Sequence, residues 1–376
     1  MRRVMILQEY IPEYRVAFWE ELHSRAATEE IDIVVACGRP NGAQSMRGDS
    51  ATVSFVVPLL HREWILLGRR VVVRKISAAA KHADLIILEQ ARRNLDAYQL
   101  LGARRPRGRV VALWGHGRDY TRRTRGADRV VTRWLTSRAD WFFAYTQGGV
   151  EAVVKDGYPR ERTTVVQNSI DTSALRAGIS SVQEVEVESF RERYDLRDKT
   201  ALFVGALDES KRLQFLLEAA EKSSELDCNF RLVIAGDGPL RSTVESWASR
   251  YDWLTYLGPV DGTRKAVALA SAQVLAMPGR VGLVAVDSFA AGLPIITTDW
   301  GWHAPEFEYL VNGRNSIVAG DTVILYSRAL VETINDSKLL SRLREACNQD
   351  STKYTVEIMA ENFLDGIRQV LMGDRL

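Results

Sequence analysis

The chain has 376 residues, of which 46% are hydrophobic and 26% are charged. At roughly 100–200 residues per domain, this length predicts two domains, and the balance of apolar and charged residues excludes a disordered chain. The three cysteines lie far apart in the sequence, which excludes a disulfide framework and a CxxC metal site and suits a reducing compartment.

The charge is distributed unevenly along the chain. Residues 1–176 carry 29 Lys and Arg against 19 Asp and Glu, whereas residues 177–376 carry 21 against 29. Basic residues gather at 62–75, around Trp64, Ile65 and Leu66, and at 104–138, which holds eleven arginines. Arginine beside tryptophan and leucine is typical of a surface that meets anionic lipid, so we expect peripheral membrane contact through the first half; a solvated helix face is the alternative. Nucleic acid is not an expected partner, because no nucleic-acid-binding motif is present.

Short apolar runs alternate with amphipathic stretches along the chain. Six runs in the first half predict buried strands, at 4–7, 31–36, 85–88, 110–114, 141–145 and 163–167. Five more follow in the second half, at 201–205, 231–235, 253–257, 272–277 and 294–298. Helical periodicity occupies most of the gaps, at 18–25, 121–138, 211–223, 240–251 and 338–348. This alternation predicts an α/β fold with two Rossmann-like, doubly wound parallel-sheet domains.

The boundary between the domains is visible in the composition. Residues 172–189 have no strong periodicity and gain acidic charge, which predicts a linker. We therefore expect one domain over residues 1–172 and a second over residues 190–355. Residues 356–376 have apolar residues at helical spacing and predict a tail helix.

Three strand ends in the second half predict parts of a phosphate-binding site. The first strand ends at Gly205, which lets the chain turn sharply, and Lys211 and Arg212 just beyond it can reach a phosphate. The second strand ends at Gly236 in a similar glycine-rich turn. The third ends near Leu257, which can form a wall against a nucleotide base.

The segment from Met277 to Asp287 is the most informative. Pro278 and Gly279 break a buried strand, and a helix is expected to restart near Gly282. The first N–H groups of that helix, over the run Val281, Gly282, Leu283 and Val284, have no partner inside the helix and suit a diphosphate. Asp287 lies one helical turn further on, where its carboxylate can accept hydrogen bonds from ribose hydroxyls.

These segments, in this order, resemble the donor-binding domain of the GT-B retaining glycosyltransferases, family 4 in particular. The resembling stretches are FVGALDESKRL, VIAGDGPL, YLGPV, MPGRVGLVAVDSFAAGLPIITT and HAPEFEYLVNGRNSIV. The resemblance implies a GT-B fold whose two domains face a central cleft, a nucleotide-sugar donor, no required metal ion or cofactor, and a tail helix that crosses back onto the first domain. It also implies that Lys211 binds phosphate, that Asp287 binds ribose, and that residues 281–284 lie under the diphosphate.

Two positions depart from the family pattern. The first acid of its paired-acid motif falls on Gly279, and its usual arginine falls on Ala206. Arg212 or Arg280 can replace the missing positive charge; the sequence does not decide between them. A variant subgroup with a PGxVGL motif resembles this chain closely, which favours substitution over decay.

The first half carries weaker signals, at strand ends that we expect to lie on one edge of its sheet. Tyr14 and Arg15 follow the first strand and are candidates to bind the acceptor. Glu89 and His116 each follow another strand and are candidates to shape the acceptor or sugar pocket; the structural alternatives are an inter-strand cap and a satisfied histidine. Asn168 is expected to stabilise a turn. In the second half, His303 suits cleft lining and helix capping equally.

The sequence therefore predicts a hexosyltransferase that moves a sugar from a UDP-, GDP- or dTDP-sugar to a glycan or lipid-linked acceptor in surface polysaccharide biosynthesis. A sugar-nucleotide epimerase of GT-B fold, an inactive relative that serves as a partner subunit, and a sugar-nucleotide-binding regulator are the alternatives. The N-terminus lacks a cleavage site, and no uncharged apolar run reaches about 18 residues. We expect a cytoplasmic protein at the inner face of the plasma membrane.

Overall fold

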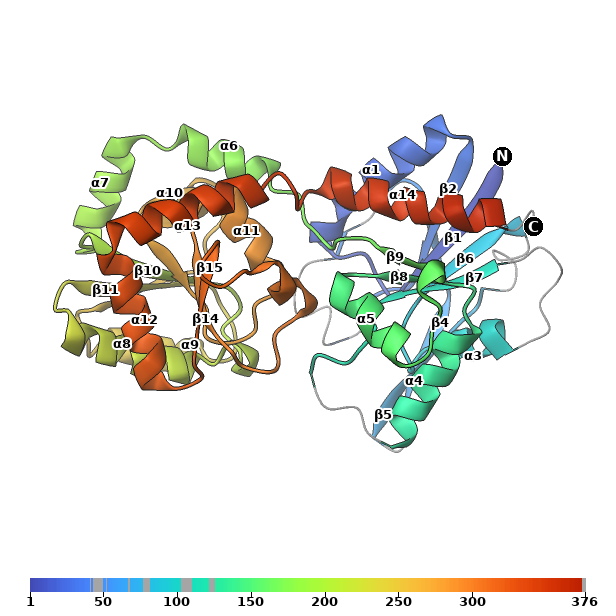
Figure 1. Cartoon of the computed structure of the whole chain (residues 1–376), viewed down its shortest axis with the longest axis horizontal. Coiled ribbons are helices and arrows are strands. Elements are labelled where there is room, and N and C mark those ends of the chain that lie inside the picture. The colour runs from blue at the N-terminus through green and yellow to red at the C-terminus, as the bar shows by residue number, and fades with distance from the viewer. Residues whose placement is uncertain are drawn as a thin grey trace. The chain divides into compact units, whose positions relative to one another are not determined.

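The structure, a computed structural model, describes residues 1–40, 42, 50–51, 53–66, 68–76, 82–102, 110–121 and 126–373. The chain forms two compact units (Figure 1). Unit 1 comprises Met1–Asp171 and Val356–Leu376, and unit 2 comprises Thr172–Thr355. Among the described residues, no helix has the length and apolar character that crossing a membrane requires.

Unit 1 is built on a parallel seven-stranded sheet with the strand order β3-β2-β1-β6-β7-β8-β9. Its strands are β1 (Arg2–Gln8), β2 (Ile31–Cys37), β3 (Val56–Pro58), β6 (Leu85–Glu89), β7 (Val110–Gly115), β8 (Trp141–Ala144) and β9 (Thr163–Val165). Its helices are η1 (Glu13–Arg15), α1 (Val16–Thr28), α3 (Leu95–Gly102), α4 (Ala127–Arg138), α5 (Gln147–Lys155), η3 (Arg160–Arg162) and α14 (Val356–Gly373).

Alternate side chains of β1 enter two separate cores. Val4 and Ile6 pack with α1 and α14, whereas Met5 and Leu7 pack with α3, α4 and α5. Because successive side chains of a strand point to opposite faces, both faces of the sheet are covered. This explains why the central strands are continuous apolar runs, and it confirms the prediction of an α/β fold with doubly wound parallel sheets.

The segment from 61 to 74 forms a hairpin that the sequence analysis did not predict. Strands β4 (His61–Leu66) and β5 (Arg69–Arg74) pair antiparallel as a separate two-stranded sheet. The turn contains Gly68, whose φ of 72° is a left-handed conformation that favours glycine. The second basic stretch, 104–138, is only partly described: residues 104–109 and 122–125 lie outside the described residues, and α4 begins at Ala127.

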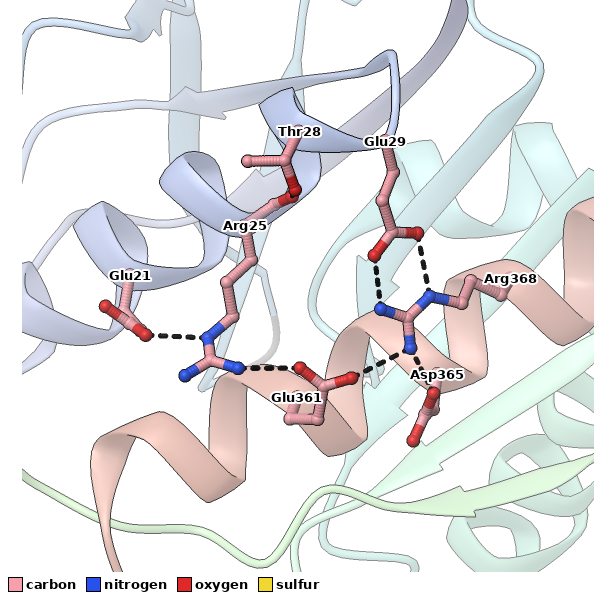
Figure 2. A network of polar contacts seen from close by, with 7 residues as sticks. All are labelled: Glu21, Arg25, Thr28, Glu29, Glu361, Asp365 and Arg368. Carbon is pink, nitrogen blue, oxygen red and sulfur yellow. Dashed lines mark hydrogen bonds and ion pairs between the residues drawn. The ribbon is translucent and has the colours of Figure 1, made fainter.

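Helix α14 packs against strand β8 through an apolar contact and against the α1 region through an ionic one. The Phe363 ring stacks on Phe143, with ring centroids 4.7 Å apart, and Gly366 lets the helix approach closely, because a Cβ there would lie 2.4 Å from the Phe143 ring. Figure 2 shows the ionic contact, in which Arg25 and Arg368 both bind Glu361 and Arg368 also binds Glu29. Their hydrogen bonds lower the pKa of the Glu361 carboxyl.

Unit 2 is built on a parallel six-stranded sheet with the strand order β12-β11-β10-β13-β14-β15. Its strands are β10 (Lys199–Val204), β11 (Phe230–Ala235), β12 (Leu254–Gly258), β13 (Val274–Ala276), β14 (Ile295–Thr298) and β15 (Ser316–Ala319). Its helices are α6 (Ser173–Ser181), α7 (Glu184–Arg193), η4 (Glu209–Lys211), α8 (Leu213–Leu226), α9 (Arg241–Ala248), α10 (Gly262–Ala270), α11 (Val284–Ala290), η5 (Pro305–Tyr309), α12 (Val323–Asn335) and α13 (Ser337–Asp350).

The expected linker is helical instead. Residues 172–189 contain α6 and the first part of α7, and both helices pack against α10 within unit 2. A capping box at Gln183 and Glu186 starts α7. The acidic residues Glu184 and Glu186, which suggested a linker, therefore occupy the first turn of a helix, where negative charge is favourable.

Candidate functional site

Three strand ends of unit 2 are joined by backbone contacts. The N–H of Gly205 donates to the carbonyl of Ala235 at 3.0 Å, and the N–H of Gly236 donates to the carbonyl of Gly258 at 2.8 Å. A Cβ on Gly236 would lie only 1.8 Å from the carbonyl oxygen of Gly205, so this approach requires glycine. Gly205, Gly236 and the β12 end near Leu257 therefore lie together at the carboxyl edge of the sheet.

The Lys211 ammonium lies at the segment that follows β13. Its Nζ donates to the carbonyl oxygen of Arg280 at 2.7 Å, two residues before Gly282. Burial lowers the pKa of Lys211, the positive charge of Arg280 lowers it further, and the Asp208 carboxylate opposes both. Two cations therefore lie beside the backbone that the sequence analysis assigned to the diphosphate, and an anion would relieve their repulsion.

His303 holds that backbone in place. Its Nδ1 accepts a hydrogen bond from the Val281 N–H at 3.1 Å, and its Nε2 lies 2.9 Å from the carbonyl oxygen of Thr298. The imidazole therefore carries its proton on Nε2, and it stacks on Phe307 with ring centroids 4.1 Å apart. Burial lowers the pKa of His303 to about 4, so the ring is neutral at pH 7. The sequence analysis considered cleft lining and helix capping for His303, whereas its hydrogen bond to Val281 supports the backbone of the candidate site.

The helix expected near Gly282 begins two residues later, as the seven-residue α11. Its first hydrogen bond runs from the Ala285 N–H to the Gly282 carbonyl, so the N–H groups of Gly282, Leu283 and Val284 precede the helical ladder. The buried Glu306 carboxylate lies beside them: a Cβ on Gly282 would come within 3.7 Å of its Oε2. The sequence analysis quoted this stretch only for its resemblance and gave Glu306 no role.

Arg212 is engaged by the protein. Its guanidinium forms an ion pair with Asp321 and lies over the Phe215 ring, 4.2 Å from the centroid. Its Nη1 also lies 3.3 Å from the Thr298 hydroxyl. Arg280, by contrast, follows directly on the Gly279 turn, and its backbone N–H donates to Ser210 at 2.8 Å. Of the two candidates for the missing family arginine, Arg280 is the one whose charge acts on Lys211.

Asp287 and Leu257 also have protein partners. The Asp287 carboxylate accepts from Lys265 Nζ at 3.0 Å, a contact that the sequence did not predict. The Leu257 carbonyl accepts from Arg264 at 2.9 Å, and the Leu257 side chain is buried. Both cations come from α10, so this helix fixes the orientation of the two groups.

In unit 1, Glu89 and His116 end neighbouring strands. Glu89 pairs in register with Trp114 of β7, two residues before His116. The turn that carries the exposed His116 is fixed by Gly117, whose N–H donates to Gln90 at 3.0 Å and whose φ of 73° suits glycine. The imidazole packs edge-on against the Tyr145 ring, with centroids 4.5 Å apart.

Glu89 belongs to a cluster of charged groups that sequence reasoning missed. The hairpin contributes Arg74, which binds Asp96 through Nε at 3.0 Å and lies 3.6 Å from Glu89, beyond hydrogen-bond distance. Glu9 of the β1 end binds Arg70 at 3.1 Å and also binds Arg93. Burial, followed by the negative charge of Glu9, raises the pKa of Glu89 to about 7. Arg70 and Arg74 lie four residues apart in β5 and therefore on one face of the strand, which was the available signal.

Tyr14 and Arg15, the two candidates that follow β1, differ in their exposure to solvent. Tyr14 is half exposed, whereas Arg15 is buried inside unit 1 rather than presented to a bound anion. The Arg15 guanidinium donates to the side chain of Asn168 and lies 5.5 Å from the centroids of Trp114 and Tyr145. Asn168 thereby ties the turn after β9 to η1, as a structural residue does.

Comparison with known proteins gives two family matches. Residues 198–336 match the family described as glycosyl transferases group 1. Residues 16–174 match Glycosyltransferase Family 4. The first match contains the joined strand ends and Lys211, and the second contains Glu89 and His116.

Individual relatives are distant. The chain is 29% identical to an uncharacterized glycosyltransferase, MJ1607, of Methanocaldococcus jannaschii over 41% of each chain. It is 28% identical to a phosphatidyl-myo-inositol mannosyltransferase of Mycobacterium leprae over 46% of each chain. The chain thus spans less than half the length of these curated relatives.

A solved structure covers the whole chain. Anabaena Alr3699/HepE, solved in complex with UDP, shares the fold with a TM-score of 0.71 at 14% identity, covering 98% of this chain and all of that one. The fold is therefore GT-B, with two Rossmann-like parallel-sheet domains. Together with the two family matches, it supports a GT-B glycosyltransferase.

Proposed function

We propose that this chain is a retaining hexosyltransferase that uses a UDP-, GDP- or dTDP-sugar and requires no metal ion or cofactor. Its acceptor is a glycan or lipid-linked sugar of surface polysaccharide biosynthesis, at the cytoplasmic face of the membrane. One observation carries the proposal: Lys211 Nζ lies 2.7 Å from the Arg280 carbonyl, beside the N–H groups that precede α11. The name of the mycobacterial relative, a mannosyltransferase acting on a phosphatidylinositol, supports a hexose donor and a lipid acceptor.

Unit 2 provides the donor site in this proposal. The Gly282, Leu283 and Val284 amides bind the diphosphate, Asp287 binds the ribose hydroxyls, and the strand ends at Gly205, Gly236 and Leu257 surround the nucleoside. Lys211 stabilises the negative charge that develops on the leaving diphosphate, with Arg280 beside it. A preorganised hydrogen-bond donor such as this ammonium stabilises developing charge most strongly where water is partly excluded. The burial of Lys211 meets that condition.

Unit 1 provides the acceptor side. With a pKa of about 7, Glu89 is shared between its protonated and ionised forms near neutral pH, so it can donate a hydrogen bond to a hydroxyl or accept one from it. His116 is held exposed on the neighbouring strand end. In a retaining reaction without a covalent intermediate, the leaving phosphate takes the proton of the acceptor hydroxyl, so these side chains position the acceptor.

The test measures nucleotide binding and donor turnover on the same protein. Thermal shift with UDP, GDP and dTDP identifies the base, because a ligand of the folded state raises the melting temperature. Release of nucleoside diphosphate from the matching sugar nucleotide then measures turnover. Lys211→Ala should lower turnover by about 100–1000-fold, while Lys222→Ala, an exposed lysine of α8, should leave it unchanged.

The outcomes separate the alternatives. Near-wild-type turnover in Lys211→Ala contradicts the proposal. Binding of a nucleoside diphosphate without turnover of any donor indicates an inactive relative or a regulator. Interconversion of the sugar without release of nucleotide indicates an epimerase.

A further inference from the structure

The outer strand of the β4–β5 hairpin exposes an unusual run of large apolar side chains. Trp64 is 50% exposed, Ile65 75% and Leu66 63%, and Leu60 just before the strand is 76% exposed. Strand β5 differs, because its residues Val72 and Arg74 are buried. Single exposed apolar residues are common on proteins, but four within seven positions form a patch that indicates an interaction surface. We call Leu60, Trp64, Ile65 and Leu66 the hairpin patch.

The patch is presented by a hairpin that is firmly attached. The Val72 N–H donates to the Arg93 carbonyl at 2.7 Å, and Arg70 binds Glu9 at 3.1 Å. Arg74 binds Asp96 in a fully buried ion pair. These contacts fix β5 to the carboxyl edge of the unit 1 sheet. The apolar side chains of β4 are therefore exposed by the architecture and not by fraying of a loose segment.

Cations outnumber carboxylates on the hairpin over 61–74, where Arg70 pairs with its one acid, Glu63, at 2.8 Å. Arg62 and Arg69 are exposed on the hairpin, and Arg69 binds Asp128 at 2.8 Å, which joins the hairpin to the first turn of α4 (Figure 1). On α4, Val130 and Trp134 lie one turn apart and are both exposed, at 67% and 38%. Arginine next to exposed tryptophan and aliphatic side chains matches the chemistry of a bilayer with anionic headgroups.

The hairpin patch is apolar on both faces of its strand. Successive residues of a strand point to opposite faces, so Trp64 and Leu66 point one way and Ile65 the other, yet all three are exposed. A flat protein surface would cover one of these faces only. Immersion in an apolar medium covers both, and a shallow depth keeps the strand's backbone groups within reach of headgroups and water.

A second copy of the chain suits this surface less well. A symmetric contact joins the same patch of both copies, so the exposed Arg62 and Arg69 of each copy would be gathered in one shared interface. We propose that the β4–β5 hairpin docks this protein onto an anionic lipid bilayer by inserting Trp64, Ile65 and Leu66. The inference stands on the hairpin alone and holds whether or not the donor assignment does.

The test is flotation of the full chain with two kinds of vesicle, phosphatidylcholine alone and phosphatidylcholine with phosphatidylglycerol. The protein should float with the anionic vesicles, and added salt should weaken this. Ile65→Asp and Trp64→Ser should reduce the bound fraction to that seen with phosphatidylcholine alone. Leu226→Asp, an equally exposed apolar residue of α8, should float like the wild type.

Three results would overturn the proposal. One is a wild-type chain that does not bind anionic vesicles. Another is an Ile65→Asp chain that binds them as well as the wild type. The third is a wild-type dimer in light scattering that Ile65→Asp makes monomeric, which would assign the patch to self-association. The melting temperature of each variant without ligand shows whether it is folded, and Lys211→Ala should float normally even if the donor assignment fails.

Discussion

A Cβ placed on Gly279 would lie 2.4 Å from the carbonyl carbon of Lys211. The same Cβ would lie 2.6 Å from the carbonyl oxygen of Ser210, which accepts a hydrogen bond from the Arg280 N–H at 2.8 Å. The backbone around Lys211 therefore leaves no room for a side chain at Gly279, the position where the sequence analysis expected the first acid of the paired-acid motif. The glycine is part of how this chain holds Lys211 in place.

Restoring the family acid should consequently impair the protein. Gly279→Glu, and Gly279→Ala as a smaller change, should each destabilise unit 2 by about 1–3 kcal/mol, because overpacking must displace backbone. Both should also weaken nucleotide binding by moving Lys211. The measurements are urea unfolding and calorimetric titration with the cognate nucleoside diphosphate. A gain of activity in Gly279→Glu would show that the backbone accommodates the acid and that this explanation is wrong.

The support that His303 gives to Val281 yields a second prediction. His303→Phe can still stack on Phe307 but loses the acceptor for the Val281 N–H, and a buried donor left without a partner costs about 1–3 kcal/mol. We expect lower stability together with weaker nucleotide binding. His303→Gln offers both an acceptor and a donor and should retain most of each property. If His303→Phe binds the nucleotide as tightly as the wild type does, His303 does not support the nucleotide site.

Asp287 and Lys265 can be tested as a pair. If Asp287 binds ribose, Asp287→Ala should weaken nucleotide binding by about 10–100-fold, since a hydrogen bond to a charged group contributes about 1.5–3 kcal/mol. Lys265→Ala, which removes only the ion pair, should change affinity far less. The same calorimetric titration measures both variants. If both variants lose the same amount of nucleotide affinity, the ion pair and not a ribose contact accounts for the loss.

Much of the fold was predictable because buried parallel strands are continuous apolar runs. The runs at 4–7 and 201–205 predicted β1 and β10, interior strands of the two sheets. The hairpin was not predicted, because its outer strand β4 has no buried residue to impose an alternating pattern. The helices over 173–189 were missed because α6 and α7 have no buried residues, so no apolar face reveals a period.

The candidate site was predictable where one backbone segment carries it. In the segment over 277–287, Pro278, Gly279 and Gly282 predicted a broken strand followed by the start of a helix. The contacts of Lys265 and His303 with this segment were not predictable, because both residues reach it from positions that only the folded chain brings together. For the same reason, no local pattern announced that Glu9 acts on Glu89 or that Arg15 is buried.

The raised pKa of Glu89 gives a prediction with a defined sign. Its value is about 7 in the folded protein against 4.5 for an ordinary glutamate, and the surrounding charges are Glu9, Asp96, Arg74 and Arg93. Between these two values the folded state holds a proton that the unfolded chain has released, so stability falls as pH rises through this window. Glu89→Gln cannot ionise. It should match the wild type near pH 4.5 and be more stable at pH 8, by about 1–3 kcal/mol.

Chemical unfolding of both proteins at several pH values between those limits measures this difference. Glu20→Gln, an exposed carboxylate of α1, provides the matched control and should leave the pH dependence of the wild type unchanged. A Gln variant that loses stability with rising pH as steeply as the wild type would place the proton elsewhere in the cluster. Glu89 would then be ionised, and its proposed ability to donate a hydrogen bond to the acceptor would be contradicted.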